Sequence, residues 1–457
     1  MKKIIVLFIT VIWLIPGFGQ HKISFTTGNY IRALKHATDV MVNDVTSPVA
    51  ASRYYGYINL AANETVSLFD KQQPHFAEFL KGLKKITIDD ALIKKSDPQL
   101  AVILALYKSG ARLLPSGYIL QKKYDSLKNV AKKRKKFSSS KINATVELVD
   151  KVVEQVLEYA NADGFVKLSG LRRFTPSSGD EYWQPTAPGF ISAIEPHWNM
   201  LRTFILDSCT QFAGGPPNKY DADTSSRFYK QLNEVYELQK NLPQEKAAIA
   251  MFWDCNPFAL QQVGHLEFGI KKISPVGHWM GITGIACIKQ KSSLSKTVYV
   301  HAIVAIGMAD AFISCWNNKY KYNRVRPETA IRKLIDRNWS PLLQTPPFPE
   351  YTSGHSVIST TASTILTYLF GDHFSFTDNT EEEFSLPSRK FNSFAKASKE
   401  AAISRLYGGI HFRDAIENGV KEGEQIGKFV IERSPHSQEN NNNNVRTFSK
   451  QVKNKDQ

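Results

Sequence analysis

Residues 298–316 read VYVHAIVAIGMADAFISCW, an apolar stretch that is interrupted by His301 and Asp310. A second stretch, residues 357–370, is similar but contains several Ser and Thr. A helix that crosses a membrane needs about 20 predominantly apolar residues with few or no charges. We therefore expect both stretches to be helices buried in the core of a globular protein.

Helical periodicity also marks much of the remaining chain. Apolar residues recur at i, i+3 and i+4 in four further segments, residues 147–161, 225–240, 400–407 and 412–432. Strand signals are sparse, and Asn-Gly turns between alternating segments are missing. The sequence predicts an all-α fold with few or no strands, joined by loops that contain Pro and Gly.

Composition excludes several classes of protein. The chain has 457 residues, of which 42% are hydrophobic and 22% charged, so general disorder, collagen and a coiled-coil rod are excluded. The formal net charge of +16 favours anionic partners or substrates. The four cysteines are too few for a disulfide scaffold, and none lies in a CxxC pair, which argues against a thiol metal site or a thioredoxin motif. Four cysteines could form two disulfides in three different ways, and the sequence does not favour one of them.

The N-terminus has the pattern of a secretory signal peptide at residues 1–19. A basic start is followed by an uncharged apolar run at residues 4–15 and by Gly17 and Gly19 before Gln20. The apolar run is about a dozen residues, too short to span a bilayer. We expect an exported protein, periplasmic or secreted, without stable membrane insertion.

The remaining chain is expected to form a single α-helical domain at residues 20–433, followed by a flexible Asn-rich tail at residues 434–457. Residues 122–141 carry nine basic residues and one acid. This segment could bind an anionic polymer or envelope surface, but a solvated helix face is the reading that we favour. We expect no nucleic-acid partner, and self-association into a homo-oligomer stays open.

The first of three motifs with chemical character is Lys319 followed by Arg326 and Pro327. Phe312, Trp316 and Lys319 are spaced so that they share one helix face. Pro327 suits the first position of a helix, which places Arg326 at a helix N-terminus, where backbone donors favour an anion. The two cations could together hold an oxyanion.

The second motif is Ser353-Gly354-His355, directly before a predicted helix at residues 356–370. Ser353 suits the N-cap, and Gly354 allows its backbone N–H to come close to a ligand. His355 would lie in the first turn beside that ligand, as an acid or a base.

The third motif is Arg405 followed by Gly408, Gly409 and His411. The glycines should end one helix before the next begins, so Arg405 and His411 can face a common point. Asp414 lies three residues further on and could orient the imidazole of His411. The three motifs together offer cations, a hydroxyl, a backbone donor and two histidines for a tetrahedral oxyanion, phosphate or vanadate.

The order and spacing of these motifs resemble the signature shared by vanadium-dependent haloperoxidases and type 2 phosphatidic-acid phosphatases. The resemblance extends upstream to residues 183–188, 195–198 and 277–279, which are similar to elements of the secreted bacterial haloperoxidases, particularly the iodoperoxidase-like branch. One departure is Thr352, where the family usually has Pro. The family fold implies a core of two four-helix bundles.

The resemblance also implies a role for each residue of the anion site, which would lie within residues 312–415. The vanadate-binding or phosphate-binding residues would be Lys319, Arg326, Ser353, Gly354, Arg405 and His411. Among them, His411 would be the vanadium ligand and Lys319 would polarise bound peroxide, while His355 would be the acid–base group. Trp316 and Phe348 would wall the halide pocket.

Two functions remain open at this point. The first is a vanadate-dependent haloperoxidase that uses hydrogen peroxide to oxidise a halide, with iodide expected first and bromide as the alternative, to hypohalous acid. The second is a secreted acid phosphatase in which His411 would be phosphorylated. The anion sites of the two classes are nearly the same, but an exported chain with aromatic side chains beside the cations favours the peroxidase.

Overall fold

The computed structural model describes residues 26–133, 137–263 and 266–435, and of residues 261–268 it describes the backbone alone. The signal peptide predicted at residues 1–19 and nearly all of the tail predicted at residues 434–457 lie outside the described residues. In the described part, helices dominate, with two short two-stranded antiparallel sheets, which confirms the all-α prediction.

The first half of the described chain contains the helices α1 (Thr27–Asn43), α2 (Pro48–Ser67), η1 (Phe76–Glu78), α3 (Asp90–Lys95), α4 (Pro98–Leu113), α5 (Tyr118–Lys133), α6 (Ser139–Asn161), α7 (Phe165–Leu168), η2 (Trp198–Met200), α8 (Arg227–Lys240) and α9 (Gln244–Phe252). The second half contains α10 (Pro275–Lys289), α11 (Leu294–Tyr322), α12 (Pro327–Leu334), α13 (Gly354–Phe370), η3 (Glu382–Phe384), α14 (Phe394–Tyr407) and α15 (Arg413–Arg433). The paired strands are β1 (Leu260–Val263) with β2 (Leu266–Gly269), and β3 (Phe376–Asp378) with β4 (Arg389–Phe391).

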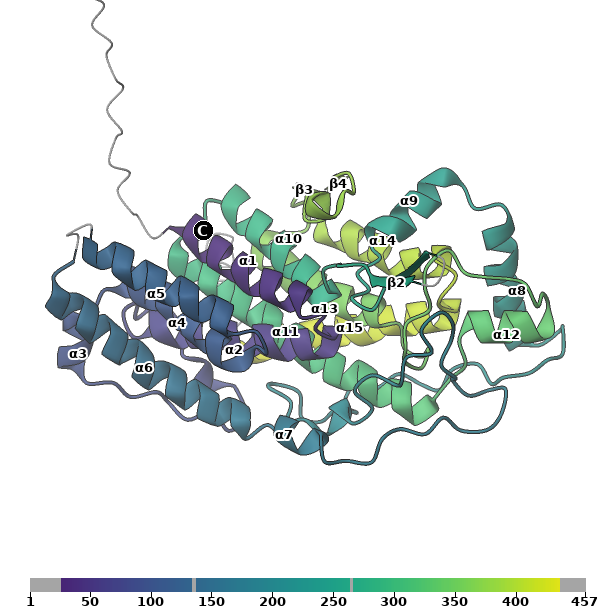
Figure 1. Ribbon diagram of the computed structural model, residues 1–457, viewed down its shortest axis with the longest axis horizontal. Helices are drawn as coiled ribbons and strands as arrows, with labels where there is room; N and C mark the ends of the chain where they lie inside the picture. Colours follow the sequence, from purple (N-terminus) through teal and green to yellow (C-terminus); the bar gives the residue numbers. More distant parts are fainter. Residues whose placement is uncertain (1–25, 134–136, 264–265, 436–457) are drawn as a thin grey trace, which may run out of the picture.

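Helix α11 is the central element of the molecule. It packs against α2 on one side and against α13 on the other, and α13 packs in turn against α14 and α15 (Figure 1). Helices α3 to α6 lie at one end of the long axis, and α8, α9 and α12 lie at the other (Figure 1). By length and apolar composition α11 could cross a membrane, but its apolar window is entirely buried inside the structure. The prediction of a buried core helix at residues 298–316 is therefore confirmed.

Polar residues inside α11 have specific partners. The carboxylate of Asp310 accepts three hydrogen bonds, of 2.6 to 2.9 Å, from the backbone N–H groups of residues 204–206. His301 bonds through Nδ1 to the carbonyl of Thr297 at 2.7 Å. The bonds to Asp310 satisfy its buried carboxylate and fix a loop to the core, whereas Nε2 of His301 is buried without a hydrogen-bond partner among the described residues.

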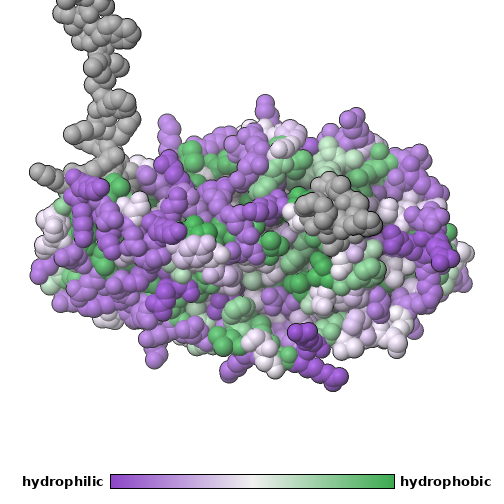
Figure 2. Space-filling view, viewed as in Figure 1, coloured by the Kyte–Doolittle hydropathy of each residue, from purple (hydrophilic) through white to green (hydrophobic). Residues whose placement is uncertain are grey.

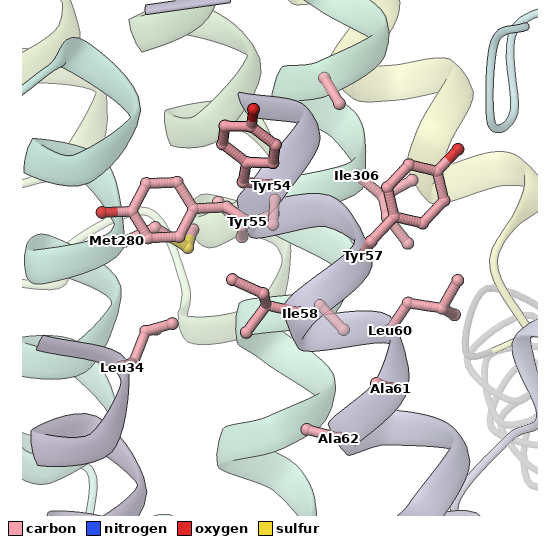
Figure 3. Close-up of a cluster of buried hydrophobic side chains, with 14 of the residues drawn as sticks. Leu34, Tyr54, Tyr55, Tyr57, Ile58, Leu60, Ala61, Ala62, Met280 and Ile306 are labelled. Atoms are coloured by element: carbon pink, nitrogen blue, oxygen red, sulfur yellow. The ribbon is translucent and has the colours of Figure 1, made fainter. Parts of the chain in front are cut away.

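Helix α2 packs against α4 and α6 among the N-terminal helices and against the central helix α11. Tyr55, Ile58 and other side chains of this helix interlock with Leu34 of α1 and Met280 of α10 (Figure 3). The hydroxyl of Tyr55 pairs with Thr38 at 2.7 Å, so that its polar end is also satisfied. This core supports the elements that build the anion site.

The surface is mostly polar, with small separate apolar patches on the face shown in Figure 2. Helix α5, which carries much of the basic segment, buries Leu120, Tyr124 and Ala131. Its lysines at positions 122, 123, 132 and 133 are exposed. The described part of the segment therefore presents its lysines to solvent, and its role stays a prediction.

Candidate active site

The three motifs converge on one small cavity at the end of α11 and α13. Its volume is about 30 Å³, which suits a small inorganic ligand. The predicted site residues that line it are Trp316, Phe348, Gly354, His355, Arg405 and His411. Lys319, Arg326 and Ser353 are fully buried directly behind this lining.

Local sequence explains how the chain reaches the cavity. Ser353 caps α13, and its hydroxyl accepts a hydrogen bond from the N–H of Ser356 at 3.4 Å. Arg326 is the N-cap residue of α12, directly before Pro327. Gly409 has a φ of +75° in the turn that follows α14, a conformation that favours glycine. These findings agree with the helix boundaries predicted around the motifs.

His411 is held in one tautomer by a carboxylate. Its Nδ1 lies 2.8 Å from Oε1 of Glu350. Because a carboxylate can only accept, Nδ1 carries the proton and donates a hydrogen bond to it. Nε2 is then a lone-pair acceptor, and it accepts a hydrogen bond from Arg326 at 3.1 Å. Burial, followed by the charges of Arg326 and Lys319, holds the pKa of His411 well below its usual range. The imidazole is therefore neutral, and the Nε2 lone pair that could bind a metal accepts the hydrogen bond from Arg326 in this structure.

Arg326 and Lys319 are anchored to backbone carbonyls. Arg326 donates from Nε to the carbonyl of Phe348 at 3.0 Å and from a terminal nitrogen to that of Ile410 at 2.9 Å. Lys319 Nζ donates to the carbonyls of residues 349, 350 and 352 at 3.0, 3.1 and 2.6 Å. Burial lowers the pKa of Lys319 to about 8 and that of Arg326 to about 10. Neither cation lines the cavity, but both are fully buried, and Arg326 contacts the cavity wall through Nε2 of His411.

Arg405 reaches the cavity from α14. Its Nε donates to the hydroxyl of Ser404 at 3.0 Å, and a terminal nitrogen donates to the carbonyl of Ala250 at 3.2 Å. Burial lowers its pKa, yet an arginine stays protonated, so the cavity has a permanent positive charge.

His355 lies in the first turn of α13, as predicted. Among the described residues, its Nε2 is buried without a hydrogen-bond partner, while the other ring nitrogen bonds to the backbone of Trp253. Its pKa lies well below the usual value because of burial first and then the positive charge of Arg405. Lys319 and Arg326 are not among the main causes of this shift.

Aromatic rings close one side of the cavity. Trp316 lies 4.9 Å from Phe348 between ring centroids, and its indole N–H donates to the carbonyl of Ile194 at 3.2 Å. Lys319 Nζ lies 5.0 Å from the ring centroid of Phe348, within reach of a cation–π interaction. An added Cβ at Gly354 would lie 3.8 Å from Trp316, which is ordinary contact. Glycine is thus not needed to avoid a clash with Trp316 there.

Asp414 does not orient His411, and that prediction is wrong. Its carboxylate instead receives two hydrogen bonds from Arg324, at 2.6 and 2.7 Å. Arg324 also lies 3.0 Å from Oε2 of Glu350 in an ion pair. Asp414 is therefore linked to His411 only through Arg324 and Glu350, because the first turn of α15 turns its side chain toward Arg324.

Two carboxylates that contribute to the site carried little sequence signal. Glu350 stands three residues before Ser353, inside the second motif, but its partner His411 is 61 residues away. Glu422 on α15 accepts hydrogen bonds from Ser314, Asn318 and Thr352 at 2.7 to 3.0 Å. Its pKa is raised to about 7 by burial. Thr352, where the family usually has Pro, uses its hydroxyl for this contact.

The donor set fits vanadate. The cavity is lined by the neutral imidazoles of His411 and His355, the guanidinium of Arg405 and the backbone of Gly354. Arg405 can donate hydrogen bonds to the oxygens of a small tetrahedral oxyanion, and the unprotonated Nε2 of His411, which now accepts from Arg326, could be a nitrogen ligand to vanadium.

Comparisons with known proteins agree with this geometry. The family model described as the VCPO second helical-bundle domain matches residues 299–338 and 333–439. A bacterial vanadium-dependent iodoperoxidase of known structure is 41% identical, with a TM-score of 0.85, and the match covers 90% of this chain and 98% of that one. A search of curated proteins found no match.

The fold is also shared with a bacterial vanadium-dependent chloroperoxidase in two forms. The holo form is 15% identical with a TM-score of 0.64, covering 85% of this chain and 92% of that one. The apo form is 15% identical with a TM-score of 0.62, covering 84% and 92%. At this identity the likeness concerns the fold alone. With the 41% identical relative matched over nearly its whole length, the chain belongs to the vanadium-dependent haloperoxidase family.

Proposed function

We propose that this protein is a vanadate-dependent haloperoxidase that uses hydrogen peroxide to oxidise iodide to hypoiodous acid. The observation that carries the proposal is the neutral His411, whose tautomer is set by Glu350 at the wall of a small cationic cavity. The preference for iodide is supported by the 41% identical relative, which is described as an iodoperoxidase. Bromide is the alternative halide.

The residues divide into holding and proton-transfer roles. Lys319, Arg326 and Arg405, with the Ser353 hydroxyl and the Gly354 N–H, would hold vanadate, and His411 Nε2 would be its ligand. Bound vanadate supplies a Lewis acid that activates peroxide without itself changing oxidation state.

Proton transfer is assigned to His355. Because its Nε2 is neutral and unpartnered among the described residues, it can accept the proton of incoming hydrogen peroxide. The imidazolium that results can then protonate the oxygen that leaves as water. Trp316 and Phe348 would form an apolar wall on the halide side of the cavity and exclude water there.

The alternative, a phosphatase, would use the same cations with His411 as nucleophile. The 41% identical relative, which is an iodoperoxidase, favours the peroxidase. The test is a paired assay on protein prepared with and without vanadate. We expect vanadate-dependent and peroxide-dependent iodide oxidation. Ester hydrolysis by the vanadate-free protein, with no iodide oxidation after loading, would identify a phosphatase instead.

We also propose that the protein is exported and that it does not insert stably into the membrane. Support comes from the pattern of residues 1–19 and from the burial of α11, the one described helix that is long and apolar enough to span a bilayer. Expression in a bacterium should yield a processed chain that begins at Gln20 in the periplasm or the medium. An unprocessed N-terminus in the membrane fraction would contradict this, and sedimentation of the processed chain would test whether it forms a homo-oligomer.

A further inference from the structure

A second polar cluster lies outside the anion site, where the loop after α9 meets α10 and the segment after β3. It consists of Cys255, His278 and Glu381, all buried, and each offers one ligand atom within 4.8 Å of the others. His278 belongs to the upstream element at residues 277–279, which plays no part in the proposed reaction. We propose that this cluster is a binding site for a divalent transition-metal ion, with Zn²⁺ as the best fit to its ligands.

The distances between the three ligand atoms match a tetrahedral site. Nδ1 of His278 lies 3.4 Å from Sγ of Cys255 and 3.0 Å from Oε1 of Glu381, and the sulfur lies 3.8 Å from that oxygen. Zinc at its usual bond lengths and tetrahedral angles would separate these pairs by about 3.6, 3.4 and 3.6 Å. An ion can therefore enter with shifts of a few tenths of an ångström, and the combination of S, N and O ligands suits zinc.

The imidazole is oriented as in known metal sites. Nε2 of His278 lies 2.7 Å from Oδ2 of Asp378, and Asp378 is itself held by the N–H and hydroxyl of Thr380 at 3.1 and 2.6 Å. A histidine that binds a metal usually donates its other N–H to a carboxylate in this way. With Nε2 protonated, Nδ1 is free to bind an ion.

The ligand set also suits the charge of the ion. With Cys255 bound as a thiolate and His278 as a neutral imidazole, one thiolate and the carboxylates of Asp378 and Glu381 surround the ion. A divalent ion then leaves the buried cluster with a net charge of about −1, close to neutral.

An entry route is present. Glu381 also lines a surface cavity of about 660 Å³. The charged residues along that cavity are Asp39, Asp254, Lys271, Lys272, Glu381 and Glu383. Lys272 pairs with Asp254, and Lys35 pairs with Asp39 and Glu383, so the mouth of the site is close to neutral and does not repel a cation.

The metal would have a structural role beside the catalytic cavity. Trp253 stacks on His278 at 4.5 Å between ring centroids, and its backbone bonds to His355. Cys255 lines the catalytic cavity as well. An ion on Cys255 and His278 would thus fix the loop that positions His355. In the sequence, the absence of a CxxC pair argued against a thiol metal site. That argument does not apply to this cluster, because its one thiol and two other ligands come from three separate segments.

The test measures metal binding and needs no catalysis. The full untagged chain is treated with a chelator, and Zn²⁺ is titrated in competition with a chromophoric chelator, with and without vanadate. We expect one equivalent of Zn²⁺ per chain. Asp378→Asn should lower the affinity by about 10- to 100-fold, and Cys255→Ala should lower it further. Cys287→Ala, which removes a buried thiol outside the cluster, should bind as the wild type does.

Cobalt provides a readout that does not depend on the variants folding. The wild-type chain loaded with Co²⁺ should show thiolate-to-cobalt charge transfer together with tetrahedral d–d absorption. Failure of the wild type to take up stoichiometric zinc, an unchanged affinity in folded Cys255→Ala, or a cobalt spectrum without thiolate charge transfer would each overturn the proposal. None of these outcomes depends on whether the protein oxidises iodide.

Discussion

Replacing Glu350 by glutamine should weaken vanadate binding by about 5- to 30-fold, because the carboxylate sets the tautomer and basicity of His411. Oε1 of Glu350 accepts two hydrogen bonds, from His411 Nδ1 at 2.8 Å and from the N–H of Phe412 at 2.9 Å. Oε2 lies 3.0 Å from Nε of Arg324. A glutamine can keep the first two contacts through its carbonyl oxygen, so the fold should be preserved.

The magnitude follows from the charge that is lost. A hydrogen bond to a charged group contributes about 1.5–3 kcal/mol and one between neutral groups about 0.5–1.5, so the change costs about 1–2 kcal/mol. That free energy corresponds to roughly 5- to 30-fold in the dissociation constant. In addition, the amide NH₂ of glutamine would face the guanidinium of Arg324, where both groups are donors.

The assay is equilibrium binding of vanadate, followed by vanadium NMR or by dialysis with metal analysis. Asp414→Asn is the matched control, since Asp414 shares Arg324 with Glu350 but does not touch His411. We expect this control to bind vanadate nearly as the wild type does. Equal affinity in the wild type and Glu350→Gln, or equal losses in both variants, would refute the assignment of Glu350 to His411.

Three further predictions concern proton transfer, anion competition and stability. His355→Ala should keep most of its vanadate affinity, because His411 and the cations remain, yet lose about 10²–10⁴-fold in iodide oxidation; parallel loss of vanadium and activity would make His355 a binding residue. Phosphate should compete with vanadate during loading, and an unchanged vanadate affinity at high phosphate would show that the two anions do not share the cations. Burial lowers the pKa of His301 to about 4 from an unfolded value of about 6.5. As the pH falls, His301 is therefore protonated in the unfolded chain before it is protonated in the folded chain. Its contribution to the free energy of unfolding is complete above pH 6.5 and falls by about 3 kcal/mol as the pH drops to 4. Denaturant unfolding of wild type and His301→Gln between pH 4 and 7 should show a stability difference that varies with pH in this direction, and a constant difference would contradict it.

Local features of the sequence were sufficient to predict several of the helices and the motif residues that meet at the cavity. Ser353 caps α13 and Arg326 precedes α12, as the motifs predicted, because capping depends on residues within one turn of each other. The polar interruptions of residues 298–316 also distinguished a buried core helix from a membrane span. The cavity lined by Gly354, His355, Arg405 and His411 confirms that the motifs meet.

Contacts between distant segments could be decided only by the tertiary structure. The sequence predicted that Asp414 contacts His411. In the structure Asp414 instead accepts hydrogen bonds from Arg324, and the carboxylate that contacts the His411 imidazole is Glu350. The cluster of Cys255 and His278 is another case, because its ligands are separated along the chain by 23 residues or more. Spacing within a helix fixes which residues share a face, but which faces meet depends on how whole helices pack. For that reason the motif residues could be named from the sequence, while the carboxylates that orient them could not.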